Sequence, residues 1–174
     1  GSVFEHCFLN FVVTNASRIY THEMVRHRAG TAFSQTSGRY VRNDELNIVV
    51  DPILEPIYDL VEEARAYLED WRLRAEEKIG VNEEKSFAKK KKITSALRRL
   101  SPNAQSNELG FSLNIRTLRQ TIEARTSEHA EWEIRLIFNQ VYDLVFKSYP
   151  AIFADAKLEL IDGLNQITFK NKKI

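Results

Sequence analysis

The densest group of residues that could carry chemistry lies in the first quarter of the chain. Arg26, His27 and Arg28 stand together, and hydroxyl side chains, an amide and a further arginine follow closely: Thr31, Ser34, Gln35, Thr36, Ser37, Arg39 and Tyr40. Guanidinium groups bind phosphate in a bidentate manner, and hydroxyls and loop amides satisfy the remaining oxygens. These residue types therefore predict an oxyanion site. Arginines at a helix C-terminus also compensate the helix dipole, so composition alone leaves that structural role open.

Length and composition bound the possible functions. The 174 residues suit one domain, and 43% hydrophobic with 28% charged residues indicates a globular chain. With 25 Lys+Arg against 24 Asp+Glu, the net charge is +1, so local arrangement rather than a general basic field must hold an anion. We therefore expect no nucleic-acid partner. One cysteine, and no signal peptide or long apolar run, lead us to expect a cytoplasmic protein without a membrane partner.

Hydrophobic periodicity and capping residues predict the elements that position these side chains. We expect a strand at 7–13, a helix at 16–28 capped by Asn15, a loop at 30–38, and extended segments at 40–42 and 47–50. Further helices are expected at 53–79, closed by Gly80, at 82–100, capped by Asn82, and at 114–126 and 128–147. A short strand or a turn is expected at 109–113, and a strand at 166–169.

The order of several motifs resembles the flavin-dependent thymidylate synthase family. The carrying blocks are Arg26-His27-Arg28 with Ser37-Gly38-Arg39-Tyr40, then Ser2-Val3-Phe4-Glu5-His6, Asn114-Ile115-Arg116, Arg125, and His129-Ala130-Glu131-Trp132-Glu133-Ile134-Arg135. The resemblance runs from about Ser2 to Phe153, and several separate blocks in the right order are far more specific than one motif. It implies an α/β (α+β) fold with a small, mostly antiparallel sheet and several long helices.

By this resemblance, the chain would transfer a one-carbon unit from 5,10-methylenetetrahydrofolate to C5 of dUMP and form dTMP. NADPH would supply the hydride through FAD, which performs the redox chemistry. The family also implies a homotetramer with sites shared between subunits. The implied small-molecule partners are thus a pyrimidine nucleoside monophosphate and a folate.

Activation of the pyrimidine is the step that the protein itself must perform. C5 of uracil is a poor nucleophile, so an enzyme either adds a thiolate to the ring or draws charge onto its nitrogen and oxygens. Cys7 lies in a Phe-rich strand pattern where a small apolar residue would also fit, and no basic or helix-N-terminal setting is evident that would lower its pKa, which argues against a thiolate. The residue that matches the family's activating arginine is Arg125, a fixed cation facing a developing enolate.

The other site residues are implied position by position. Nucleotide contacts would come from Glu23, Arg26, Gln35, Ser37, Gly38, Arg39, Arg98 and Arg125, with Arg125 catalytic. Flavin contacts would come from Ser2, Arg26, His27, Arg28, Gln35, Asn114, Arg116 and Gln120. Arg98 is adjacent to Arg99, so a solvated surface role for one of them stays open. His22, His27 and His129 form no metal-binding spacing, and we expect no metal.

Helix geometry adds an inference about Arg116 and Arg125. The two residues are nine positions apart, and at about 100° per residue they point about 180° from each other. One helix would then serve two pockets, which implies sites built between subunits. The alternative is that one arginine is a surface residue.

Glu23 and Lys89–Lys92 each have two interpretations. The family commonly has Gln at the position of Glu23, and a carboxylate prefers an amino partner, so a relative acting on a cytidylate or a ribonucleotide stays open. Alternatively, Glu23 pairs with Arg26 one turn away. Lys89–Lys92 could bind nucleic acid, but neighbouring Glu83 and Glu84 and the lack of interleaved aromatics favour a solvated helix face.

The beginning of the chain bears on activity. Gly1 directly precedes the Ser2–His6 block, so we expect a single domain over 1–174 that lacks the family's usual N-terminal segment. A non-catalytic nucleotide-binding relative therefore remains an alternative.

Overall fold

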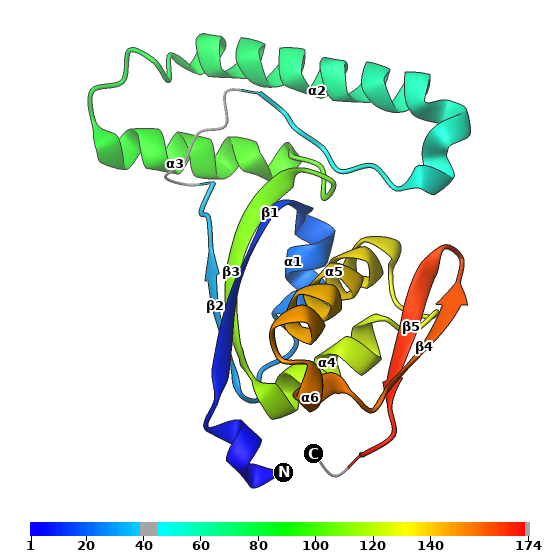
Figure 1. Ribbon diagram of the computed structural model, residues 1–174. Helices are drawn as coiled ribbons and strands as arrows, with labels where there is room; N and C mark the ends of the chain where they lie inside the picture. The colour runs from blue at the N-terminus through cyan, green and yellow to red at the C-terminus, as the bar shows by residue number, and fades with distance from the viewer. Residues whose placement is uncertain (39–44, 173–174) are drawn as a thin grey trace. The chain divides into compact units, whose positions relative to one another are not determined.

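The computed structural model describes residues 1–38 and 45–172 (Figure 1). The chain forms two compact units: one comprises Gly1–Val13, Tyr20–Ser34 and Gly110–Ile174, and the other comprises Thr14–Ile19 and Gln35–Leu109. The predicted α+β class, with small sheets and long helices, is confirmed. Among the described helices, none has the length and apolar character needed to cross a membrane.

A three-stranded sheet has the order β1-β3-β2, with β1 at Phe8–Ser17, β2 at Thr31–Gln35 and β3 at Ser106–Asn114. The strand predicted at 7–13 is confirmed, residues 109–113 form the strand rather than the turn, and both strands extend further. In the first unit, Phe111 and Leu113 alternate toward the core, and the Phe11 ring stacks on Phe111 at 5.1 Å between centroids. This period of two is what fixes the buried face of a strand.

The loop predicted at 30–38 is wrong, because β2 occupies most of it. Ser and Thr favour loops locally, but pairing with β3 supplies partners for the backbone, including the bond from Thr36 N–H to the Glu108 carbonyl at 3.1 Å. Residues 47–50 form an isolated bridge between Ile48 and Gln105 rather than a strand. The extended segment predicted at 40–42 lies outside the described residues.

Helix α1 spans Arg18–Met24, so the helix predicted at 16–28 is too long at both ends. Asn15 does not cap it: Asn15 lies within β1 at φ 56°, a conformation that asparagine tolerates. After Met24 the helix gives way to a turn, in which the N–H groups of Arg26 and His27 donate to the carbonyls of Glu23 and Met24, three residues back, at 3.3 and 3.1 Å.

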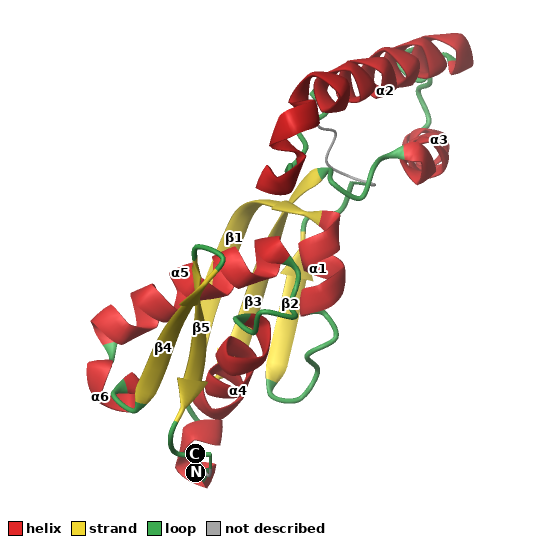
Figure 2. Ribbon diagram, turned by 90° about the vertical axis from the view of Figure 1, so that its right-hand side faces the viewer, coloured by secondary structure: helices red, strands yellow, loops and turns green. Residues whose placement is uncertain are grey.

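Two helices form the core of the first unit with the sheet. Helix α4 (Ile115–Arg125) confirms its prediction and packs against α5 (Trp132–Ser148), β5 and the 3-10 turn η1 at Ser2–Glu5 (Figure 2). Helix α5 begins later than predicted because the Glu131 carboxylate caps it, accepting from the backbone N–H groups of Glu133 and Ile134. The buried face comprises Leu118, Ile122, Ile134 and Phe138, all 0% exposed.

A hairpin closes the chain after the short helix α6 (Pro150–Phe153). Strands β4 (Ala156–Ile161) and β5 (Leu164–Phe169) pair antiparallel around Asp162 and Gly163, which both have positive φ. The strand predicted at 166–169 is confirmed, whereas β4 was not predicted, although Ala156, Leu158 and Leu160 alternate with Lys157 and Glu159 as in a strand. The buried Arg119 of α4 anchors this region: its guanidinium pairs with Asp155 and lies 4.0 Å from the centre of the Phe169 ring.

The second unit contains η2 (Pro52–Ile57), α2 (Tyr58–Ile79), α3 (Phe87–Leu97) and η3 (Arg98–Leu100). The long helix at 53–79 and its left-handed Gly80 cap are confirmed apart from the first 3-10 turn. The cap predicted at Asn82 is wrong, because Ser86 accepts from the Lys89 N–H and α3 starts at Phe87.

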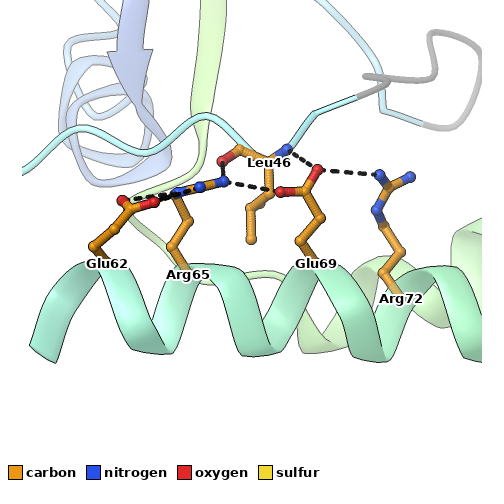
Figure 3. Close-up of polar contacts among 5 residues, drawn as sticks. All are labelled: Leu46, Glu62, Arg65, Glu69 and Arg72. Atoms are coloured by element: carbon orange, nitrogen blue, oxygen red, sulfur yellow. Dashed lines mark hydrogen bonds and ion pairs between the residues drawn. The ribbon is translucent and has the colours of Figure 1, made fainter.

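Ion pairs run along α2 and also hold the chain at Leu46 (Figure 3). Arg65 pairs with Glu62 and, at 2.8 Å, with Glu69. The Leu46 N–H donates to Glu69 at 3.3 Å, and the Leu46 carbonyl accepts from Arg65 at 3.5 Å. These contacts tie the segment that leads into η2 to the middle of α2.

Candidate functional site

Helix α4 positions the Arg-His-Arg segment. The Asn114 side chain caps the helix by accepting from the Thr117 N–H at 2.8 Å, and the Asn114 N–H donates to the Gly30 carbonyl at 3.0 Å. The Thr117 hydroxyl donates to the Ala29 carbonyl at 3.1 Å. Gly30 adopts φ +66°, and a Cβ there would lie 2.2 Å from Asn114 Nδ2, so only glycine fits this approach. Residues 27–30 are thereby held against α4.

At the other end of α4, Arg125 is fixed by two residues of the α1 region. Its Nε–H donates to His27 Nε2 at 2.6 Å, its Nη1 donates to the Glu23 carboxylate at 2.8 Å, and its Nη2 donates to the Glu23 backbone carbonyl at 3.2 Å. A guanidinium has five N–H donors, so these contacts orient Arg125 and leave donors for a ligand. This cluster of Glu23, His27 and Arg125 is the strongest candidate for an activating site.

The protonation of His27 follows from this geometry. Burial lowers the pKa of His27, and the positive charge of Arg125 lowers it further. The imidazole is therefore neutral at neutral pH, and Nε2 keeps the lone pair that accepts from Arg125. The pair fixes Arg125 without adding a second positive charge beside it.

The Glu131 carboxylate, at the start of α5, interacts electrostatically with Glu23 and Glu133. Burial raises the pKa of Glu131, and the negative charges of Glu133 and Glu23 raise it further, although backbone N–H groups of Ile134 and Glu133 oppose the shift. The Glu133 charge also adds to the burial that raises the pKa of Tyr20. Glu131 therefore lies within electrostatic range of Glu23, the ion-pair partner of Arg125.

Arg26 and Arg28 flank His27, and both side chains are exposed. Arg116, in the first turn of α4, pairs with Glu5 of η1 and is 46% exposed. Arg116 and Arg125 thus have different partners at opposite ends of one helix. Exposed guanidinium groups near a helix N-terminus provide suitable donors for a phosphate-bearing cofactor.

The remaining predicted residues fall in several places. Ser2 and Gln120 are exposed in the first unit, and Asn114 is buried as the cap of α4. Gln35, Ser37, Gly38 and Arg98 belong to the second unit, where Arg98 is exposed in η3. Arg39 lies outside the described residues. The structure therefore brings together Glu23, His27 and Arg125 at one end of α4, and Asn114 and Arg116 at the other.

The predicted pairing of Glu23 with Arg26 is wrong for the described side chains. Glu23 pairs with Arg125 at 2.8 Å, whereas the Arg26 contact with Glu23 is a backbone bond. Helix α1 ends at Met24, so Arg26 is no longer on the helical face that an i,i+3 pair requires.

Sequence reasoning assigned no individual role to Glu5 or Glu131. Glu5 is the ion-pair partner of Arg116, and Glu131 caps α5 beside the Arg125 cluster. An acidic residue directly before an apolar helical run is a capping signal that could have identified Glu131. No comparable local signal exists for Glu5, whose partner is far away in the sequence.

Lys89–Lys92 lie on α3, where Lys89 pairs with Glu84 at 3.6 Å. An open groove of about 410 Å³ follows this helix and is lined by Ala88, Lys91, Lys92, Ser95, Ala96 and Arg99. Cys7 is exposed just before β1. Across residues 1–38 and 45–172, no three His, Cys, Asp or Glu side chains gather as a metal site would require.

Known proteins are similar to this chain in sequence. Residues 1–151 match the thymidylate synthase complementing protein family. The flavin-dependent thymidylate synthase of Mycobacterium tuberculosis is 33% identical over 175 residues, covering 96% of this chain and 69% of the relative. The Corynebacterium glutamicum enzyme of the same name is 34% identical over the same shares.

The fold matches solved structures as well. The crystal structure of thymidylate synthase X from Helicobacter pylori with FAD and dUMP superposes with a TM-score of 0.60 at 20% identity, covering 88% of this chain and 74% of that one. At this identity the match concerns the fold alone. The motifs, the extent of the sequence match and the shared fold agree, and the chain belongs to the thymidylate synthase complementing protein family, the flavin-dependent thymidylate synthases.

Proposed function

We propose that this chain transfers a one-carbon unit from 5,10-methylenetetrahydrofolate to C5 of dUMP and forms dTMP, with FAD as cofactor and NADPH as reductant. Membership of the family supports the reaction class. The observation that carries the proposal is the Arg125 guanidinium, oriented by Glu23 and a neutral His27. The use of folate and NADPH fits a cytoplasmic enzyme.

Arg125 would activate the pyrimidine by electrostatics. C5 becomes nucleophilic when negative charge develops on the ring nitrogen and oxygens, and a preoriented guanidinium stabilises that charge without reorganising. Its contacts to α1 already fix its direction, so little ordering is needed when the nucleotide binds. Cys7 does not belong to this cluster, and the proposed route requires no thiolate.

The exposed arginines of the first unit fit the flavin cofactor. Arg26, Arg28 and Arg116 present guanidinium donors that suit a diphosphate, and the Gly30 backbone approach holds the Arg-His-Arg segment in place. FAD supplies the hydride chemistry when bound. The chain's own part is to bind the phosphates, orient the cofactor and present Arg125 to the pyrimidine. We propose Ser37, Gly38, Arg39 and Arg98 as further nucleotide-binding residues only because they match the motifs of the family.

We propose a homotetramer in which subunits share sites. Support comes from the single helix α4, which presents Arg116 and Arg125 to different partners at its two ends. If one helix contributes to two pockets, other subunits can supply the remaining residues of each pocket. Sedimentation velocity of the purified chain measures the assembly, and a monomer with full activity would refute shared sites.

A cytidylate substrate is the second candidate, favoured by one observation. The Glu23 carboxylate is 23% exposed beside Arg125 and could accept from the exocyclic amino group of cytosine. Uracil has a carbonyl at that position, which a carboxylate repels. Tritium release from C5-labelled dUMP and dCMP separates the two candidates, because only the true substrate loses its label.

The decisive experiment for the proposed function is a flavin spectrum followed by turnover. Purified chain should bind FAD, show the flavin absorbance band, and change that spectrum when dUMP is added. With folate and NADPH it should then release tritium from C5-labelled dUMP. A chain that cannot be loaded with FAD would refute the flavin enzyme, and nucleotide binding without turnover would indicate a non-catalytic relative.

A further inference from the structure

The side chain that holds Arg125 is negatively charged, and both partners are largely removed from solvent. Arg125 and Glu23 are 17% and 23% exposed, and the Nη1 to Oε2 distance is 2.8 Å. Solvent therefore screens this ion pair less than an exposed pair. An anion approaching Arg125 meets a guanidinium whose charge is already partly balanced.

We infer that Glu23 is the resident counter-ion of Arg125 and sets the affinity of the site for anionic pyrimidine nucleotides. A nucleotide must share or displace this carboxylate before it gains the full charge of the arginine. The inference rests on the proposed function, in which Arg125 faces the nucleotide. Glu23 is thus a positioning residue with a direct electrostatic effect on binding.

The groups around Glu23 offer little compensation if its carboxylate is displaced. His27 is neutral at neutral pH, and Glu131 and Glu133 contribute negative charge on the α5 side. Among the described residues, Arg125 is the cation that forms an ion pair with Glu23. Moving Glu23 away from Arg125 therefore costs free energy, which the nucleotide must offset from its own contacts.

The charge can be removed while the shape is kept. In Glu23→Gln, the amide oxygen still accepts from Arg125, but the negative charge is gone. We expect the dissociation constant for dUMP, measured by isothermal titration calorimetry on the FAD-loaded chain, to fall by about 5- to 50-fold. The matched control is Glu123→Gln on α4, the helix that carries Arg125; the Glu123 carboxylate pairs with Lys172, and the variant should leave dUMP affinity within about twofold.

Two more variants separate charge from shape. Glu23→Ala removes the same charge without the amide and should also tighten dUMP binding. Glu23→Asp keeps the charge and should stay nearer to the unmodified chain than Glu23→Gln does. Circular dichroism and flavin loading establish that each variant is folded, so a change in affinity reports on the site.

The outcomes are distinct. Tighter dUMP binding by both uncharged variants supports the counter-ion role. Unchanged or weaker dUMP binding in folded Glu23→Gln overturns it, and so does a selective loss of dCMP binding, which would mean that Glu23 recognises an amino group. If the unmodified chain binds neither dUMP nor dCMP, the proposed function itself fails, before any variant is compared.

Discussion

Replacement of Asp155 by Asn should lower the free energy of unfolding at neutral pH. In acid, the difference between the variant and the unmodified chain should disappear. The two Asp155 oxygens each lie 2.8 Å from a guanidinium nitrogen of the buried Arg119, and one also accepts from the Asn171 N–H at 2.8 Å. The hydrogen bond from Arg119 is the main reason that the pKa of Asp155 falls from 3.8 to about 2, and the Asn171 N–H adds to the shift. Asn keeps the shape of the side chain but not its charge.

The size of the effect follows from the shift. At about 1.4 kcal/mol per pKa unit, a fall from 3.8 to about 2 corresponds to at most about 2.5 kcal/mol. The Asp155 side chain is 26% exposed, and solvent screening reduces this to about 1–2 kcal/mol. Since the folded pKa lies below the unfolded pKa, the stabilisation is complete above about pH 4 and disappears as the pH falls through about 2.

Urea unfolding at fixed protein concentration measures this difference between Asp155→Asn and the unmodified chain. The gap in free energy should be about 1–2 kcal/mol near pH 7 and should shrink measurably near pH 3. Asp143→Asn, at an exposed position on α5, is the control and should change little at either pH. A gap that stays constant with pH would refute an ionic origin.

Three other substitutions test the site and its scaffold. Gly30→Ala should cost about 1–3 kcal/mol in thermal unfolding, because φ is +66° and the new Cβ would meet Asn114; an unchanged melting temperature would contradict that packing. Arg125→Ala should lower kcat far more than nucleotide affinity, since the guanidinium stabilises the negative charge of the pyrimidine ring most strongly in the activated state. Turnover equal to that of the unmodified chain would exclude Arg125 from the mechanism. Arg98→Ala should weaken dUMP binding by about 1.5–3 kcal/mol in calorimetry, and full affinity would exclude its proposed phosphate contact.

The sequence predicted correctly the helices that are marked by hydrophobic spacing and by residues at their ends. Helical spacing and Gly80 located α2, and the helix expected at 114–126 agrees with α4. The elements that were wrong or missed depend on partners far away in the chain. Strand β2, for example, forms by pairing with β3, which lies about seventy residues further along the chain. Helix α1 ends in a turn after Met24, and the segment that follows is held against the start of α4 through the carbonyls of Ala29 and Gly30.

By itself, the sequence determined the family, and it predicted an arginine-rich site with Arg125 as the activating residue, because motif order and residue type are one-dimensional properties. The tertiary structure alone decided that Glu23 pairs with Arg125 rather than Arg26, and that His27 is the neutral acceptor beside it. The physical reason is that an ion pair depends on distance in space. Residues separated by about a hundred positions meet only after α1 ends and the segment behind it packs against α4.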